Sequence, residues 1–210
     1  GETMADTTIK LNIESNGGDK AIRENAEATN RAYSSVEQKL KDLNAKYPQF
    51  TRLEQIGTSI QGRAIWALLI STTPNIENPT GLSKPSIIFD GMHHAREIMT
   101  SEIVMDVAEN TLDMLSQNTG LAPLLNRWNV WVVPMLNVDG NNIVWTQQSM
   151  WRKNAHSEGS KTFGVDINRN YPFNWNRCNG ASDSQNNDAY RGKAGASEPE
   201  TQAMMKLASE

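Results

Sequence analysis

Apolar residues recur at helical spacing near the start of the organised part of the chain. Four of them are three or four positions apart and would share one face of a helix: Tyr33, Val36, Leu40 and Leu43. Pro48 follows, and proline ends a helix because it lacks the amide hydrogen that a helix interior needs. The pattern predicts a helix from about Tyr33 to just before Pro48.

Two apolar segments then flank a stretch that is rich in turn-forming residues. Residues 51–57 and 64–71 have the composition of strands, and residues 57–62 between them contain glycine, serine and threonine. This order predicts a β-hairpin. Because residues 64–70 are nearly all apolar, we expect the second strand to be buried on both faces.

A strand, a helix and a second strand are predicted after a loop over residues 72–84. Residues 86–89 form a short apolar run that indicates a buried strand, and residues 100–115 show helical spacing of apolar positions. Residues 129–133 form another buried run. Strand, helix and strand in this order favour a parallel crossover, and hence an α/β fold with helices on both faces of a sheet.

The stretch from residue 134 to residue 196 is long, polar and loop-like. A compact domain seldom carries so long an irregular segment unless that segment has a function. After it, Ser197 and Glu200 have the spacing of a capping box, with Ser197 at the N-cap of a helix that runs to the end of the chain.

Composition sets broad limits on what the chain can be. Its 210 residues, 38% hydrophobic and 21% charged with a formal net charge of −4, are typical of a globular chain. The sequence has no basic run interleaved with aromatic residues, the pattern that would indicate a nucleic-acid site. It also has no apolar stretch that approaches the ~20 residues of a membrane span. The single cysteine, Cys178, excludes an intrachain disulfide.

Two regions are predicted. Residues 1–30 are polar and weakly patterned, and we interpret them as an N-terminal arm or propeptide remnant, with a frayed terminus as the alternative. Residues 31–210 form the folded domain. The first residues lack the charged and apolar regions of a signal peptide.

The first candidate for chemistry is the pair His94 and Glu97. An imidazole and a carboxylate three residues apart reach one point in space if the backbone turns helically, and zinc prefers such nitrogen and oxygen ligands. The pair also follows a buried strand, where open α/β sheets place their ligand sites. His93, four residues before Glu97, is an alternative ligand. A solvated polar turn without any metal is the other reading of this motif.

The second candidate is a set of arginine and asparagine residues in the long polar stretch. Arg152 follows a tryptophan, and Arg169 follows Asn168. The planar guanidinium matches a carboxylate with two parallel hydrogen bonds, and an amide beside it adds further donors. A surface salt bridge is the alternative for any single arginine. Residues 165–170 could equally form an edge strand. No Gly-x-Ser-x-Gly nucleophile motif and no glycine-rich phosphate loop are present.

Taken in order, these segments resemble the zinc carboxypeptidases of the carboxypeptidase A and carboxypeptidase T type. The resemblance runs from about Tyr33 to the end of the chain, and its specificity lies in the joint order of the motifs. They cover residues 56–63, 90–97, 137–140, 151–153, 165–170, 190–192 and 197–200. The fold that this resemblance implies is a mixed, mostly parallel sheet with helices on both faces, incomplete at the C-terminal side.

The resemblance also implies roles for individual residues. It makes His94, rather than His93, and Glu97 two ligands of one zinc ion. Arg152 then polarises the scissile carbonyl. Three further residues are implied to bind substrate, two of them at its C-terminal carboxylate and the first at an outer subsite: Arg96, Asn168 and Arg169. The activity implied is that of a metallocarboxypeptidase, which removes C-terminal residues from peptides with metal-activated water.

The family pattern needs residues that this chain does not supply. Its third zinc ligand, a substrate-side tyrosine and the general-base glutamate all lie downstream of the helix that begins at Ser197. His156 is the one remaining histidine, in a loop where the family has no ligand. We therefore expect an open sheet edge and a chain that is inactive alone. We favour a piece of a longer or cleaved protein, with the C-terminal remainder as its partner, and a truncated product is the alternative.

Two other functions remain open from the sequence. One is a non-catalytic module of the same fold that binds peptide C-termini, and the other is a zinc amidohydrolase acting on cell-wall peptides. The resemblance implies a secreted or periplasmic location, which no residue of the chain demonstrates.

Overall fold

A mixed four-stranded sheet forms the centre of the computed structural model, which describes residues 33–75, 84–118, 120–177 and 179–209. Its strands are β1 (Thr51–Thr58), β2 (Ala64–Ile70), β3 (Ser86–Asp90) and β4 (Asn129–Val133), in the spatial order β1-β2-β4-β3. The β3–β4 pair is parallel, whereas β2 pairs antiparallel with both β1 and β4. The predicted mixed α/β fold is confirmed, and parallel pairing within the described strands is confined to β3 and β4.

The predicted hairpin and crossover are both present. β1 and β2 form an antiparallel hairpin, and the parallel strands β3 and β4 are joined through α2 (Met99–Ser116) and the short α3 (Ala122–Leu125). The first helix covers residues 33–46 of the described chain, and Pro48 lies just beyond its end. These elements were predictable because each has apolar residues at its own period.

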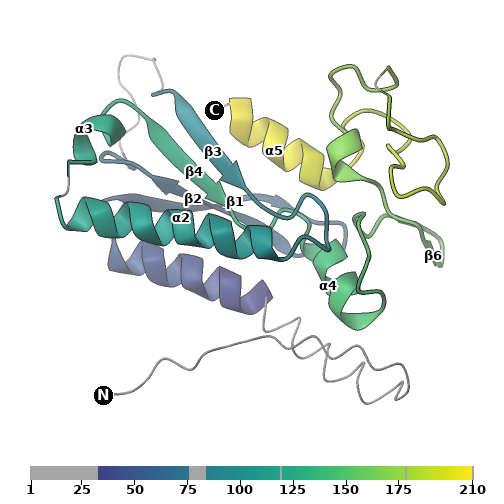
Figure 1. Cartoon of the computed structure of the whole chain (residues 1–210), viewed down its shortest axis with the longest axis horizontal. Coiled ribbons are helices and arrows are strands. Elements are labelled where there is room, and N and C mark those ends of the chain that lie inside the picture. Colours follow the sequence, from purple (N-terminus) through teal and green to yellow (C-terminus); the bar gives the residue numbers. More distant parts are fainter. Residues whose placement is uncertain (1–32, 76–83, 119, 178, 210) are drawn as a thin grey trace.

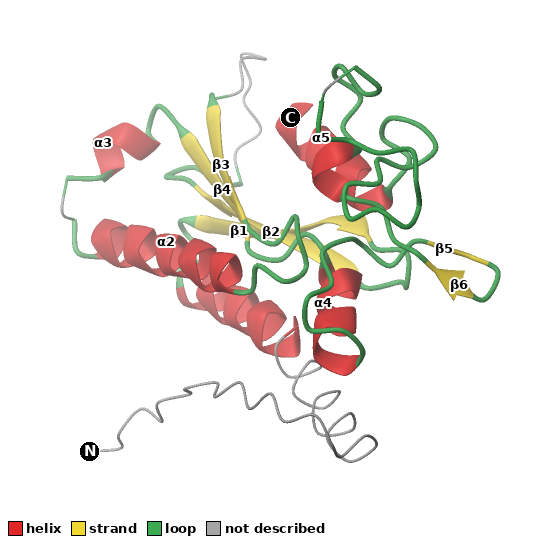
Figure 2. Cartoon of the chain, turned by 45° about the vertical axis from the view of Figure 1, so that its right-hand side comes forward, coloured by secondary structure: helices red, strands yellow, loops and turns green. Residues whose placement is uncertain are grey.

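Helices cover both faces of the sheet (Figures 1 and 2). A Cβ atom on Gly57 would lie 2.7 Å from Cβ of Ala203, so glycine allows α5 (Pro199–Ser209) to pack closely on β1. The first helix and α2 lie side by side on the opposite face, where the Tyr47 hydroxyl donates to Oδ1 of Asp113 over 2.7 Å. Successive side chains of a strand point to opposite faces of the sheet. Because both faces are covered by helices, β2 is apolar at nearly every position.

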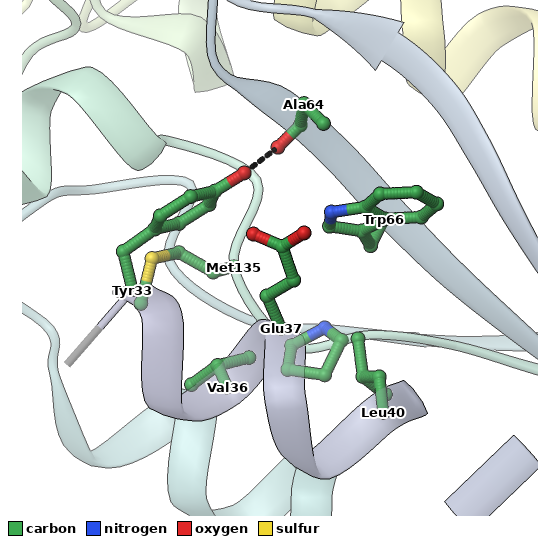
Figure 3. Close-up of a pocket in the computed structure, with 8 residues that line it drawn as sticks. Tyr33, Val36, Glu37, Leu40, Ala64, Trp66 and Met135 are labelled. Atoms are coloured by element: carbon green, nitrogen blue, oxygen red, sulfur yellow. Dashed lines mark hydrogen bonds between the residues drawn. The ribbon is translucent and has the colours of Figure 1, made fainter. Parts of the chain in front are cut away.

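The contact between the first helix and β2 is shown in Figure 3. The hydroxyl of Tyr33 donates to the carbonyl oxygen of Ala64 over 2.8 Å, while Val36 and Leu40 pack beneath Trp66. The space left between them is about 10 Å³, which holds one water molecule at most. This hollow therefore belongs to core packing and not to a ligand site.

One strand departs from its predicted environment. The sequence predicted a buried strand over residues 86–89, but Ile87 and Phe89 of β3 are 41% and 40% exposed. Ile88, between them, packs against the core. The prediction of a buried strand was wrong for these two side chains because β3 lies at the edge of the sheet, and among the described residues its outer face has no covering helix.

The long polar stretch is more structured than predicted. It contains α4 (Val138–Thr146), the two-residue strands β5 (Ser157–Glu158) and β6 (Lys161–Thr162), and the 3₁₀ helix η1 (Ile167–Arg169). Helix α4 was missed because asparagine and glycine are poor helix formers. The Asn137 side chain accepts the amide hydrogen of Gly140 and caps this helix. The possible edge strand over residues 165–170 is instead the turn that contains η1.

The predicted capping box at residues 197–200 was also wrong. Helix α5 begins at Pro199, and the Ser197 hydroxyl donates to Glu198 and accepts from Asn170. Glu200 is buried, and its Oε2 accepts from Asn154 over 3.1 Å. The two side chains therefore contact Asn170 and Asn154 and do not form the reciprocal bonds of a capping box. Among the described residues, no helix has the length and apolar character to cross a membrane.

Candidate metal and substrate site

The histidine segment begins where β3 ends, against the loop that follows β4. Gly91 occupies a space that only glycine fits, because a Cβ atom there would meet the carbonyl oxygens of Pro134 and Thr100 at 2.9 Å. The amide of Ala95 donates to the carbonyl of Arg152 over 2.9 Å and joins this segment to the long polar stretch. Both segments thus meet at the carboxyl ends of the parallel strands (Figure 1), the edge where α/β sheets bind ligands.

His94 and Glu97 face each other across one turn. Nδ1 of His94 lies 2.9 Å from Oε1 of Glu97, and the amide of Glu97 donates to the carbonyl of His94 over 3.1 Å. The imidazole is buried, whereas the Glu97 side chain is 46% exposed. His93 turns elsewhere, to Asp90 and Tyr171. The structure therefore pairs Glu97 with His94 and not with His93.

A buried carboxylate that the sequence did not single out joins the predicted residues. Oδ1 of Asp166 lies 3.3 Å from Nε2 of His94, and Oδ2 accepts from Nε and Nη2 of Arg152 at 3.1 and 3.0 Å. Asp166 has no solvent exposure. His94 and Arg152 thus face two oxygens of one carboxylate, although 58 residues separate them in the sequence.

This cluster shifts the ionisation of its members in a consistent way. Burial alone would lower the pKa of His94, but the carboxylates of Asp166 and Glu97 outweigh it and raise this pKa. Burial alone would raise the pKa of Asp166, but His94 and Arg152 outweigh it and lower that pKa. Asp166 is therefore ionised near neutral pH, and the two carboxylates beside His94 favour positive charge on its ring.

Two arginines close to His94 are each held by neighbouring groups, Arg152 by Asp166 and Arg96 by Met150 and Asp188. Arg152 donates to Asp166 through Nε and Nη2, which leaves the Nη1 hydrogens without a partner among the described residues. Arg96 donates from Nη1 to the carbonyl of Met150 over 3.0 Å and lies 3.4 Å from Oδ2 of Asp188. The loop that carries Asp188 is held by the buried Lys153, whose Nζ donates to two carbonyl oxygens of that loop.

Asn168 and Arg169 lie on η1, which starts directly after Asp166. The Asp166 carboxylate accepts the amide hydrogen of Asn168 over 3.0 Å and starts this turn. Nε of Arg169 donates to the carbonyl of Gly180 over 3.1 Å, which fixes the guanidinium against the next loop. Asn168 and Arg169 line a hollow of about 280 Å³ together with aromatic, amide and alanine side chains: Tyr171, Phe173, Asn174, Trp175, Asn176, Asn179 and Ala181.

The donor set at His94 and Glu97 fits zinc. A nitrogen and a carboxylate oxygen face each other, the exposed side of Glu97 leaves room for further ligands, and Nε2 of His94 faces a second carboxylate. Histidines that bind metals commonly have such a carboxylate at their other nitrogen, where it fixes the ring. Among the described residues, however, no group of three ligand side chains converges. His156 lies 2.8 Å from Glu198, a carboxylate outside this cluster.

Comparison with known proteins points to one family. The family model for zinc carboxypeptidases matches residues 36–210. The chain is 33% identical to metallocarboxypeptidase A of Trichophyton tonsurans over 154 residues, which are 73% of this chain and 35% of that protein. It is 30% identical to human carboxypeptidase B over 173 residues, 82% of this chain and 40% of that protein.

A solved structure shows the same fold. The carboxypeptidase A of Helicoverpa armigera superposes with a TM-score of 0.71 at 28% identity, over 83% of this chain and 41% of that one. The chain thus spans little more than a third of the curated relatives' length. The resemblance found in the sequence is confirmed, and the chain belongs to the zinc carboxypeptidase family.

Proposed function

We propose that the protein to which this chain belongs is a zinc metallocarboxypeptidase that removes C-terminal residues from peptides. The observation that carries this proposal is the cluster of His94, Glu97, Asp166 and Arg152 at the carboxyl ends of the parallel strands. It combines two side chains suited to a metal with an anchored arginine. Zinc, when bound, polarises a carbonyl group and lowers the pKa of a water molecule toward about 7.

Arg152 is assigned to the charge that develops on the scissile carbonyl oxygen. Its guanidinium is fixed by the buried Asp166, and its Nη1 hydrogens have no partner among the described residues. A donor that is oriented before the reaction stabilises the developing charge without the cost of reorganisation. Asp166 thereby orients both His94 and Arg152 toward one substrate.

Asn168 and Arg169 are assigned to the C-terminal carboxylate of the peptide. Both line the hollow of about 280 Å³, and Arg169 is already held at Nε by the Gly180 carbonyl. A guanidinium binds a carboxylate strongly and in a defined orientation. Binding of this terminus restricts cleavage to the last residue of a chain. Arg96 is assigned to an outer subsite, since the Met150 carbonyl and Asp188 orient it.

The remaining catalytic residues are assigned to the rest of the protein. Among the described residues no three side chains converge as a metal site, and the curated relatives are more than twice as long as the matched region. β3 pairs with β4 alone among the described strands, with Ile87 and Phe89 exposed beside it. A C-terminal remainder that covers this edge would supply the third ligand, the tyrosine and the general base.

Peptide digestion by the full-length protein tests this function. Mass spectrometry should detect stepwise loss of C-terminal residues from a peptide acid, with little loss from the matched C-terminal amide. A chelator should stop the reaction, and added zinc should restore it. Internal cleavage, or activity indifferent to the chelator, would refute the proposal. Arg169→Met should abolish most of the preference for the peptide acid over the amide. The control is Arg127→Met, which changes an exposed arginine at the opposite end of β4 and should keep that preference.

A binding module without catalysis is the second candidate, because no group of three possible metal ligands converges among the described residues. Such a module would bind the peptide acid in preference to the amide, as calorimetry would show, but release no product. We also infer a secreted or periplasmic location from the family relationship. Detection of the protein in the cytoplasm of its source cells, and not outside it, would contradict that inference.

A further inference from the structure

Three side chains next to the zinc-ligand pair form a continuous row of hydrogen-bonding groups. Nδ1 of His93 lies 2.6 Å from Oδ2 of Asp90, the last residue of β3. Nε2 of the same ring lies 2.8 Å from the hydroxyl of Tyr171. The two rings also pack together, with centroids 5.8 Å apart. Asp90, His93 and Tyr171 thus connect the end of β3 with the polar stretch after η1.

The chemistry of these groups fixes the direction of each hydrogen bond. An ionised carboxylate only accepts, so Nδ1 of His93 carries the hydrogen that faces Asp90. In the neutral ring Nε2 is then an acceptor, and the Tyr171 hydroxyl donates to it. Burial raises the pKa of Tyr171, and the nearby Asp90 raises it further. The hydroxyl therefore keeps its proton, and the phenol ring is held by a directed bond.

Tyr171 is also part of the wall of the hollow next to Arg169. Tyr171 lines this hollow together with Asn168 and Arg169, which precede it by three and two residues in the chain. A peptide whose terminal carboxylate lies on Arg169 must place its last side chain nearby. The aromatic groups of Tyr171 and Trp175 offer apolar surface there. The ring orientation of Tyr171 thus affects how well a large terminal side chain packs.

We propose that His93, oriented by Asp90, is a positioning residue that holds Tyr171 as a wall of the subsite for the substrate's C-terminal side chain. This inference rests on the proposed function, since it takes Arg169 as the carboxylate anchor. It gives His93 a role different from that of the neighbouring His94. It also makes the contribution of His93 depend on the size of the terminal residue.

Binding of free amino acids to the full-length, zinc-loaded protein tests the proposal without turnover. L-phenylalanine is the probe with a large side chain, and L-alanine is the small control. His93→Asn keeps an amide near Asp90 but cannot reach Tyr171, and Tyr171→Phe removes the hydroxyl alone. Each change should weaken phenylalanine binding about fivefold, the size of one net hydrogen bond. Alanine binding should change less than about twofold.

A double-mutant cycle separates positioning from general damage. If His93 acts through Tyr171, the double variant should bind phenylalanine no more weakly than either single variant. In peptide hydrolysis the same variants should raise KM with kcat nearly unchanged. Tyr33→Phe, which removes a hydroxyl bonded to Ala64 on the first helix, is the matched control and should leave binding unchanged. Zinc content is measured in every variant.

Nitrogen NMR of the His93 ring gives a readout that is independent of activity. The neutral ring should carry its hydrogen on Nδ1, and Asp90→Asn should shift the tautomer balance. Additive losses in the double variant, equal losses for alanine and phenylalanine, or a hydrogen on Nε2 would each overturn the proposal. If the unaltered protein hydrolyses no peptide, the proposed enzymatic function is refuted but this inference is not. Amino-acid binding and the His93 tautomer are both measured without hydrolysis.

Discussion

Oδ1 of Asp166 lies 3.3 Å from Nε2 of His94, while the other nitrogen of the same ring faces Glu97 over 2.9 Å. The imidazole is thus held between two carboxylates, one fully buried and one half-exposed. The buried carboxylate also anchors Arg152. One side chain therefore orients both a residue suited to zinc and a residue suited to the substrate.

Asp166→Asn tests the contribution of this carboxylate to metal affinity. The amide keeps the size of the side chain but removes the charge that orients His94. We expect zinc affinity to fall about 10- to 100-fold, as measured by competition with a chromophoric chelator. Asp113→Asn, a change on α2, is the control and should leave the affinity unaltered. Unchanged affinity in Asp166→Asn would contradict the assigned role.

Arg152→Met tests the stabilisation of charge on the carbonyl oxygen. Loss of a preorganised donor lowers kcat by roughly 10²–10³, and we expect KM to change little because Arg169 still binds the terminal carboxylate. The steady-state kinetics of peptide hydrolysis check this. Arg127→Met serves as the control for a surface arginine. A rise in KM with unchanged kcat would place Arg152 in substrate binding instead.

Glu200 should make the stability of the protein depend on pH. Burial, together with the nearby Glu198, raises the pKa of this carboxyl from 4.5 to about 7. Between these two values the folded protein holds a proton that the unfolded chain has released, so stability falls as pH rises. The decrease attributable to Glu200 is about 3 kcal/mol, complete slightly above pH 7.

The variant Glu200→Gln should remove this decrease, because a neutral amide has no proton to lose. Urea denaturation at pH 5 and pH 8 measures the difference in unfolding free energy for both proteins. Groups other than Glu200 titrate in both proteins, so their contributions to the pH dependence largely cancel when the two proteins are compared. Glu102→Gln, an exposed glutamate on α2, should behave as the unaltered protein. If Glu200→Gln keeps the full pH dependence, Glu200 is ionised in the folded state.

The sequence predicted the regular elements because their signals are local. The first helix, the hairpin and the β3–α2–β4 crossover each have apolar residues at the matching period. Helix α4 has a weaker signal, since its middle is Gly140-Asn141-Asn142 and its start depends on the Asn137 cap. The exposure of Ile87 and Phe89 follows from the position of β3 in the sheet, which strand composition does not reveal.

The candidate site likewise contains residues that local sequence patterns predicted and residues that they did not. His94 and Glu97 were predictable because their contact lies within one turn. Asp166 was missed because it meets His94 from 72 residues away in the sequence, and no spacing rule connects them. The available signal was its place just before Asn168 and Arg169, inside a segment that the family resemblance had marked. His156 and Glu198 likewise meet only through tertiary packing.

The zinc content of the purified full-length protein tests the central claim most directly. Elemental analysis should find about one zinc ion per molecule in the unaltered protein and in His93→Gln, because His93 bonds to Asp90 and Tyr171. His94→Gln and Glu97→Gln should each lose most of that zinc. Full zinc content in both of these variants, or its loss in His93→Gln alone, would contradict the assignment of His94 and Glu97 as the metal ligands.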